Sequence, residues 1–308
     1  MELHRRRWRV GTAPPAFPAW RIWEDSRVRA DNNVMALFAA ARIAKTCSAE
    51  RARTSGQPFV SDLYTVDELP FRGGFRLSLT EAMSRWEAGM EDLSRMAIVV
   101  GVAAIDDLLG AIIQLLRATG HDRSRPGSVD TGVSAKLEHL RRHGHLDLSD
   151  DTQGLYGLLV EVRHAVTHYG GRQRPVRQAW DRLGDPAREW WIAATGRALP
   201  LTRDTEELRV GDRELLGALK TLDRVALEIA RGLQATLTEA QWADLVVAEY
   251  RQLDRAKAND SSSNVRRIKR FADSVWRMRV SDAAATAALS RPTPDDLTAV
   301  AKPPTSEL

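Results

Sequence analysis

The chain has 308 residues, of which 43% are hydrophobic and 28% are charged, a composition typical of a globular protein and unlike that of a disordered one. Its net charge is +4 and its only cysteine is Cys47, which excludes an internal disulfide framework and a cysteine-rich zinc site. A modest positive charge permits a nucleic-acid partner without requiring one.

Membrane insertion is not expected from the apolar runs. The longest run covers residues 96–105 and ends at Asp106 and Asp107, too short to span a bilayer. The first ten residues are basic, but no apolar stretch follows them as it does in a secretory signal. We therefore expect a cytoplasmic protein without a membrane partner.

The first 77 residues form an N-terminal region to which the sequence assigns no role. Residues 1–30 contain prolines and tryptophans without a clear period. Apolar residues at helical spacing predict a helix over residues 33–51. Glycines and prolines between residues 54 and 77 predict loops and short strands.

Residues 78–260 are predicted to form a helical domain. Ser78 and Glu81 match a capping box at the start of a long helix that reaches about residue 118. The second half of that helix is apolar nearly all round, which is typical of a helix buried on several sides or paired with another chain. Further helices are predicted over residues 134–143, 152–169, 212–233 and about 238–258.

Two departures from a plain helical bundle are also expected. The segments EWWIAAT and ALPLT flank a Thr-Gly-Arg turn and predict a short β-hairpin insert near residues 188–203. Residues 261–308 are basic and then rich in alanine, threonine and proline, so we expect a flexible tail without a core. The fold class predicted is therefore mostly α, with this insert and an N-terminal extension.

Several familiar catalytic motifs are absent from the sequence: the glycine loops GxxxxGK[ST] and GxGxxG, the GxSxG elbow and the HExxH zinc motif. One histidine-rich segment could hold a metal. Histidines and arginines in the last turn of a helix also complement its dipole, and no partner has the usual ligand spacing. The segment comprises His139, His143, His145 and Asp147.

A second metal alternative lies on the predicted helix 152–169. Glu161 and His164 match half of a di-iron motif, and His168 follows one helical turn later. A di-iron bundle needs a second ExxH motif and two more glutamates, and the sequence has no second ExxH. We expect neither a metal nor another cofactor.

The same helix end carries a different constellation. Arg163 and His164 precede His168, and a Gly-Gly pair and a basic loop follow. Histidine transfers protons near neutral pH, and arginine can bind two phosphate oxygens at once. RNA cleavage by its own 2′-hydroxyl needs a base, an acid and positive charge on the phosphorane. Structural alternatives are an ion pair of Arg163 with Glu161 or Asp106, and a helix-capping role for His168.

This context resembles the HEPN superfamily, helical-bundle domains that often act as ribonucleases. The family motif is an arginine, then a polar residue, then a histidine that follows the arginine after four to six intervening residues; Arg163, His164 and His168 match these positions, with four intervening residues. The apolar helix near residues 98–116 resembles the long core helix of the family. The resemblance covers about residues 80–255. It implies a metal-independent endoribonuclease of the toxin or phage-defence type, with a composite site at a homodimer interface.

The resemblance also implies roles for individual residues. Arg163 would hold the scissile phosphate, His168 would be the main acid and base, and His164 would assist or position it. The products would carry 2′,3′-cyclic phosphate ends. Partners would be RNA, a second copy of the chain and an antitoxin or sensor protein. The alternative is a non-catalytic HEPN-like module that binds a nucleotide or a partner protein. Further RNA-phosphate contacts are expected from Arg172, Arg174 and Arg177, with Glu161 and Asp106 as supporting residues.

Overall fold

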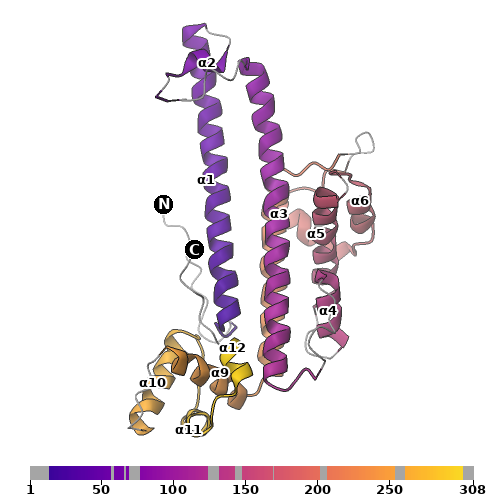
Figure 1. Ribbon diagram of the computed structural model, residues 1–308. Helices are drawn as coiled ribbons and strands as arrows, with labels where there is room; N and C mark the ends of the chain where they lie inside the picture. The colour runs from indigo at the N-terminus through magenta and orange to yellow at the C-terminus, as the bar shows by residue number, and fades with distance from the viewer. Residues whose placement is uncertain are drawn as a thin grey trace. The chain divides into compact units, whose positions relative to one another are not determined.

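The computed structural model describes residues 14–56, 59–65, 67–68, 77–123, 132–142, 148–168, 170–201, 207–253 and 261–300. Of these described residues, 79% are helical and none forms a strand; only isolated bridges occur. The predicted α-helical bundle is confirmed at this level. The helices are α1 (Pro18–Ser55), α2 (Val60–Leu63), α3 (Leu79–Ala118), α4 (Val133–Arg142), α5 (Asp150–His168), α6 (Arg174–Asp181), α7 (Asp185–Thr195), α8 (Asp212–Thr236), α9 (Glu239–Gln252), α10 (Ser261–Ser274), α11 (Asp282–Ser290) and α12 (Asp295–Val300) (Figure 1).

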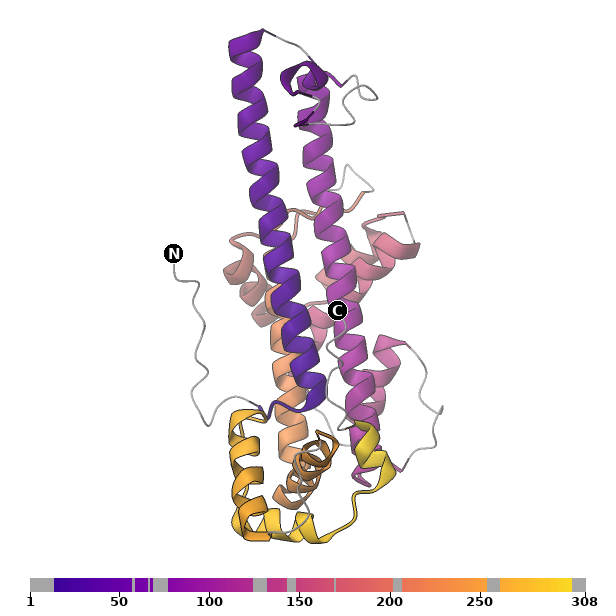
Figure 2. The ribbon, with the colours of Figure 1, turned by 60° about the vertical axis from the view of Figure 1, so that its left-hand side comes forward.

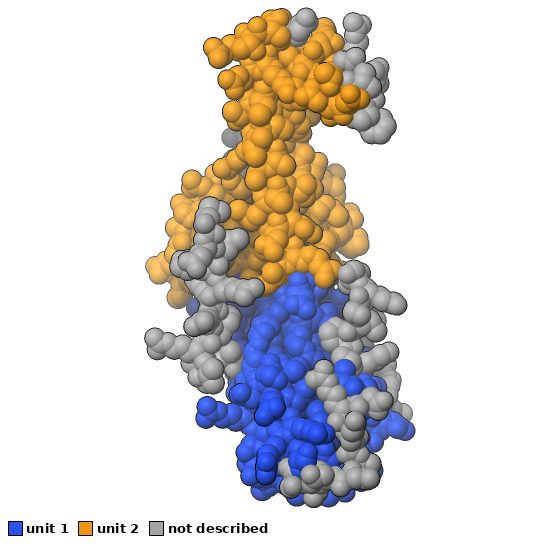
Figure 3. All heavy atoms as spheres, turned by 90° about the vertical axis from the view of Figure 1, so that its left-hand side faces the viewer, with its two compact units in different colours: residues 1–26, 103–156, 221–308 blue, residues 27–102, 157–220 orange. Residues whose placement is uncertain are grey.

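Contacts divide the chain into two compact units, coloured separately in Figure 3. Unit 1 comprises residues 1–26, 103–156 and 221–308, and unit 2 comprises residues 27–102 and 157–220. Helices α1, α3, α5 and α8 therefore each contribute residues to both units. The division into residues 1–77, 78–260 and 261–308 stays a prediction.

In unit 2, the later part of α1 lies alongside the first part of α3 (Figures 1 and 2), and an ion pair of 2.7 Å joins Lys45 Nζ to Glu87 Oε1. This pairing covers one seam of α1. Apolar residues elsewhere on the helix stay open to solvent: Met35 is 59% exposed and Ile43 is 63% exposed. Residues that are partly covered or, at Ser48, fully buried recur at the three- and four-residue steps of a coiled-coil seam: Arg27, Asp31, Val34, Phe38, Ala41, Lys45 and Ser48.

Helix α1 begins earlier than the sequence predicts, at Pro18 instead of near residue 33. Its first turns bury Trp20 and Trp23 in unit 1, whereas its later turns follow the seam in unit 2. The two parts pack in different surroundings, so no single apolar period runs through the helix. The short strands expected between residues 54 and 77 reduce, in the described residues, to α2 and one bridge from Phe59 to Ser78.

The predicted β-hairpin near residues 188–203 is wrong. The segment EWWIAAT lies in α7, which ends at Thr195 and is followed by the capping residue Gly196, with φ of 79°. Ala187, Trp191 and Thr195 are buried and lie four residues apart, so they share one helical face. The ring of Trp191 meets Trp180 of α6 edge-on, with 6.2 Å between centroids. This burial outweighs the strand preference of the aromatic residues.

The tail expected to lack a core is helical and packed in residues 261–300. Helices α10, α11 and α12 gather around α9 in unit 1 (Figure 2). Ile268, Phe271 and Trp276 are buried, and so are Ala285 and Ala288 of α11. The prediction of a tail without a core is wrong for residues 261–300. Small alanine side chains allow helices to approach closely, so they still bury apolar surface.

A buried carboxylate joins this tail to the N-terminal part of unit 1. Glu249 of α9 accepts a hydrogen bond of 2.7 Å from Trp276 Nε1 and pairs at 2.5 Å with Arg21 of α1. The Ala16 N–H donates to the Trp276 carbonyl at 2.7 Å. Segments from opposite ends of the sequence thus meet at one charged group, which no local pattern predicts.

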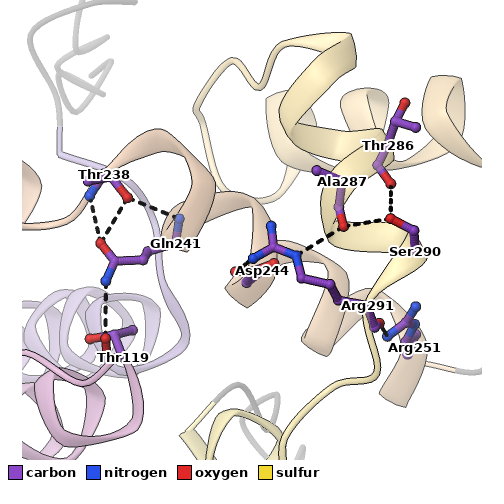
Figure 4. Close-up of polar contacts among 9 residues, drawn as sticks. All are labelled: Thr119, Thr238, Gln241, Asp244, Arg251, Thr286, Ala287, Ser290 and Arg291. Atoms are coloured by element: carbon purple, nitrogen blue, oxygen red, sulfur yellow. Dashed lines mark hydrogen bonds and ion pairs between the residues drawn. The ribbon is translucent and has the colours of Figure 1, made fainter.

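The predicted capping box at the start of α3 is confirmed, and α9 begins with a second one. Ser78 N–H donates to Glu81 Oε2 at 3.0 Å, and Glu81 N–H donates back to Ser78 Oγ at 3.2 Å. At the start of α9, Thr238 and Gln241 form the second box. Gln241 Nε2 also donates to the Thr119 carbonyl at 3.0 Å, which ties α9 to the end of α3 (Figure 4).

The start of α5 is held by a carboxylate on α8. Glu228 Oε2 accepts from the Ser149 N–H at 3.0 Å, and Oε1 accepts from Thr152 Oγ1 at 2.7 Å and from Arg224 Nε at 3.2 Å. Burial raises the pKa of Glu228, but these hydrogen bonds outweigh it, and the pKa lies below its ordinary value. Such a group stabilises the fold above its unfolded pKa and loses this contribution as the pH falls through the folded-state pKa.

Glu228→Gln is expected to lower the free energy of unfolding by about 1–3 kcal/mol at pH 7, because hydrogen bonds to a charged group are lost. The difference from the wild type should shrink as the pH falls through the lowered pKa of Glu228, because the wild-type carboxylate then becomes protonated. Urea unfolding at pH 7 and pH 3 measures both values, with the exposed Glu189→Gln as control. An equal loss at both pH values would contradict the role of the charge.

Helix α3 is long and apolar enough to cross a bilayer, judged by length and composition. An 18-residue window within it has a mean hydropathy of 2.2, and 39% of that window is buried. The core helix of a soluble protein passes the same test, so this feature does not locate the protein. The cytoplasmic location stays a prediction.

Candidate functional site

The segment Arg163–His168 forms the last turn and a half of α5, in unit 2. The helix is anchored by buried Leu159, Val162 and Ala165. Arg163 and His164 are partly exposed, and His168 is exposed. The apolar face therefore fixes the helix while the candidate residues remain accessible to a ligand from solvent.

The Gly-Gly pair after the motif ends the helix. Gly170 has φ of 60° and Gly171 has φ of 80°, values that residues with a Cβ rarely adopt. The Gly171 N–H donates back to the Ala165 carbonyl at 2.8 Å, and the Gly171 carbonyl accepts from Leu208 N–H at 2.7 Å. A bridge between Arg172 and Glu207 continues this contact. The chain after His168 thus turns back sharply and is fastened to residues 207–208.

Arg95 of α3 supports that turn, and the sequence analysis missed it. Its guanidinium is 11% exposed; Nη1 donates to the Leu208 carbonyl and pairs with Glu207, both at 3.2 Å. Nη2 pairs with Asp92 at 2.6 Å. Leu208 in turn bonds to Gly171. Arg95 therefore acts on the motif only through the backbone of other segments, far apart in the sequence, so no local pattern could have revealed it.

Within the motif, the two histidines lie together. The ring centroids of His164 and His168 are 6.0 Å apart with an angle of 47° between the planes. This agrees with the spacing of one helical turn, which places residues i and i+4 on one face. Two imidazoles at this distance can address neighbouring oxygens of one phosphodiester, one as base and one as acid.

Arg163 is not directed at the same point. Residues five apart on an ideal helix differ in direction by about 140°. Among the described residues, the Arg163 guanidinium forms no hydrogen bond or ion pair, and none joins it to Glu161. Asp106 belongs to unit 1 and pairs with Lys136 Nζ at 2.9 Å, so it has a partner other than Arg163.

The basic residues expected to bind phosphate follow the motif in unit 2. Arg172 and Arg174 are exposed, and Arg177 is partly buried. Arg174 begins α6, in which Val176 and Ala179 face the core. Arg172 and Arg174 can therefore meet an anion from solvent, whereas Arg177 is half withdrawn.

The two metal alternatives gain no support in the part of the chain that is described. His139 Nε2 lies 3.0 Å from Asp122 Oδ2, and Arg117 Nε lies 3.3 Å from the same carboxylate oxygen. The Asp122 carboxylate therefore lies between two basic side chains, those of His139 and Arg117. His143, His145 and Asp147 lie outside the described residues. Within the described ranges, no three or more His, Cys, Asp or Glu side chains gather as metal ligands.

A cavity of about 110 Å³ lies in the tail of unit 1. Its polar groups are already paired: Asp244 pairs with Arg291 at 3.2 Å, and Arg251 donates to the Arg291 carbonyl at 2.9 Å (Figure 4). Burial raises the pKa of Asp244. The volume is below the range of about 300–1,000 Å³ of ligand pockets, and we assign it to helix packing. It is lined by Asp244, Val247, Ala288, Arg291, Pro292, Thr293, Pro294 and Leu297.

Comparison of the chain with protein-family models, with curated proteins and with solved structures finds no match. The resemblance to the HEPN superfamily therefore rests on the Arg163–His168 motif and on its position at the end of a helix in an α-helical protein.

Proposed function

We propose that the protein is a metal-independent endoribonuclease of the HEPN type, a cytoplasmic toxin or phage-defence effector that cleaves cellular RNA. The observation that carries this proposal is the pairing of the His164 and His168 rings at the accessible end of α5. Arg163 on the same turn and Arg172 and Arg174 after it supply positive charge for a phosphate.

The reaction needs groups of the kinds that this helix carries. One imidazole takes the proton of the 2′-hydroxyl while that oxygen attacks phosphorus. A second imidazole gives a proton to the departing 5′-oxygen, so the products are a 2′,3′-cyclic phosphate and a 5′-hydroxyl. Arg163 stabilises the extra negative charge of the phosphorane. In this scheme His168 is the main acid and base, and His164 assists or positions it.

A second copy of the chain would complete the site. Arg163 and His168 point in directions about 140° apart on one helix, so a partner helix across a twofold axis lets one arginine meet another chain's histidine. Helix α3 offers an apolar stripe in the same unit: Leu93, Met96 and Val100 are 43%, 52% and 57% exposed at helical spacing. We propose a homodimer through α5 and this stripe.

The alternative proposal is a non-catalytic HEPN-like module that binds a nucleotide or a partner protein such as an antitoxin or sensor. The exposed apolar residues Met35 and Ile43 on α1 favour this version, since large apolar side chains exposed to solvent are typical of protein-binding surfaces when they form a patch. Cleavage of RNA separates the two functions.

Cleavage is expected to persist in excess EDTA and to leave 2′,3′-cyclic phosphate and 5′-hydroxyl ends. The physical reason is that the internal 2′-hydroxyl is the nucleophile and the histidines move the protons. Mass spectrometry of the fragments from a defined RNA measures the ends. Loss of cleavage in EDTA with recovery on adding one divalent ion, or fragments with 5′-phosphates, would indicate a metal-activated water instead.

A further inference from the structure

Helix α10 presents a strongly basic face in unit 1. Its apolar residues Ile268, Phe271 and Ala272 are buried, which fixes the helix and turns the opposite side to solvent. Arg266, Arg267 and Arg270 are exposed on that side. We call these three residues the α10 basic face.

Neighbouring basic residues are neutralised, but the α10 basic face is not. Lys269 forms an ion pair with Asp282, and Arg277 pairs with Glu24 at 2.9 Å. No carboxylate of the described residues forms an ion pair with any of the three arginines.

The spacing within the face keeps these charges close together. Arg270 lies four residues after Arg266 and three after Arg267, so all three are neighbours on the helix surface. Like charges at these spacings repel and weaken a helix. Asp273 is the nearest acidic residue along the helix and forms no ion pair with Arg270 among the described contacts. A ligand with several negative charges would relieve the repulsion between these three arginines.

The chemistry of the face selects the ligand. Arginine forks bind phosphate oxygens with two parallel hydrogen bonds, and three neighbouring forks suit successive phosphates of a strand. A membrane-binding helix would need its apolar side free to enter the lipid, whereas the apolar side of α10 is buried in the protein. The observations therefore favour a nucleic-acid backbone over a lipid surface.

We propose that the α10 basic face is a docking surface for the phosphate backbone of RNA, in a different unit from the Arg163–His168 motif. The choice of RNA rests on the proposed function, and the docking surface extends it by adding a contact that does not touch the reacting phosphate. Binding there depends little on sequence, because phosphates carry no base information.

The test is the binding of a fluorescent single-stranded RNA of about 20 nucleotides to the full-length chain, measured by anisotropy over a range of salt concentrations. All proteins carry His168→Ala, so cleavage cannot distort the measurement. The test variant is the triple change Arg266→Gln, Arg267→Gln and Arg270→Gln. The control triple removes three exposed arginines on α1 and α8, so the net charge is equal: Arg29→Gln, Arg53→Gln and Arg231→Gln.

The test variant is expected to bind at least ~10-fold more weakly and to lose about 2 from the slope of log K against log salt, or ~0.7 for each phosphate contact. The control triple should bind like its parent. Equal weakening of both triples would overturn the proposal, because charge alone would then explain it. Unchanged RNA binding with lost binding to phosphatidylserine vesicles would overturn it in favour of a membrane partner.

Circular dichroism melts show whether the test variant folds. If the test variant does not fold, a second triple that changes the same three arginines to lysine replaces it and keeps the charge. This second triple is expected to bind RNA more weakly while it retains most of the salt slope. A chain that docks RNA through α10 but never cleaves it would refute the proposed function and leave this surface standing. RNA cleavage by the chain with intact His168, together with unchanged RNA binding by the test variant, would refute the docking surface and leave the proposed function standing.

Discussion

His168→Ala is expected to lower the rate of RNA cleavage by ~10²–10⁴-fold, because a group that transfers a proton in the transition state is lost. Arg163→Ala should lower it by ~10²–10³-fold through the loss of charge on the phosphorane. Both residues lie at the accessible end of α5, so unfolding should change little. A single-turnover cleavage assay and a thermal melt of each variant measure the two effects.

Two further substitutions sharpen this prediction. His164→Ala should reduce cleavage less than His168→Ala if His164 only positions its neighbour. Thr167→Ala is the matched control: Thr167 is exposed on the same turn, and among the described residues its hydroxyl donates only to the Arg163 carbonyl, at 2.8 Å. A folded His168→Ala chain with the normal rate would contradict the catalytic role. If His168→Ala unfolds, His168→Gln decides, since a retained rate would then leave only a structural role.

Mixed dimers show whether the arginine and the histidine act from one chain or from two. A chain with Arg163→Ala is combined with a chain carrying His168→Ala. If one phosphate is served by Arg163 of one protomer and His168 of its partner, one of the two half-sites stays intact and about half the activity returns. If both groups come from one chain, neither half-site is intact and no activity returns.

Helices with a single burial pattern could be predicted from the sequence. The Ser78–Glu81 capping box marks the start of α3, and the predicted end near residue 118 agrees with Ala118. The predicted helix over residues 152–169 agrees with α5, Asp150–His168. In both cases local hydrogen bonding and one apolar pattern point to the same element.

The failures share a physical cause. In α7, the four-residue repeat of Ala187, Trp191 and Thr195 was present in the sequence, but aromatic residues also favour strands, and only burial decides between the two. In the tail, Trp276 and Glu249 stabilise each other and an arginine near the N-terminus, which requires contacts between distant segments. Short-range patterns carry no information on such contacts.

In the candidate site, too, local features could be predicted from the sequence and long-range contacts could not. The closeness of His164 and His168 follows from helical spacing alone, and the structure agrees. The support of the Gly170–Gly171 turn by Arg95 could not be predicted, because it runs through the backbone of Leu208. The relative placement of two residues on one helix can be predicted from the sequence. The groups that hold the end of that helix depend on the tertiary fold.

Trp276→Ala is expected to lower the free energy of unfolding by about 3–5 kcal/mol, the range for truncating a buried large aromatic side chain. Trp276 is fully buried, meets Trp242 edge-on at 6.2 Å between centroids and donates its N–H to Glu249. Its removal leaves a cavity and takes one hydrogen bond from a carboxylate that is 2% exposed. Guanidinium unfolding with a fitted m-value measures the change.

Two controls accompany this prediction. Trp276→Phe keeps an aromatic ring at this site but loses the donor to Glu249 and the pyrrole part of the indole, so it should cost less than Trp276→Ala. Met35→Ala removes an apolar side chain that is 59% exposed and should stay within about 0.5 kcal/mol of the wild type. If Trp276→Ala also stays within that limit, residues 261–300 do not form a stable part of the core. The α10 basic face would then lack the rigid support that its three neighbouring charges require.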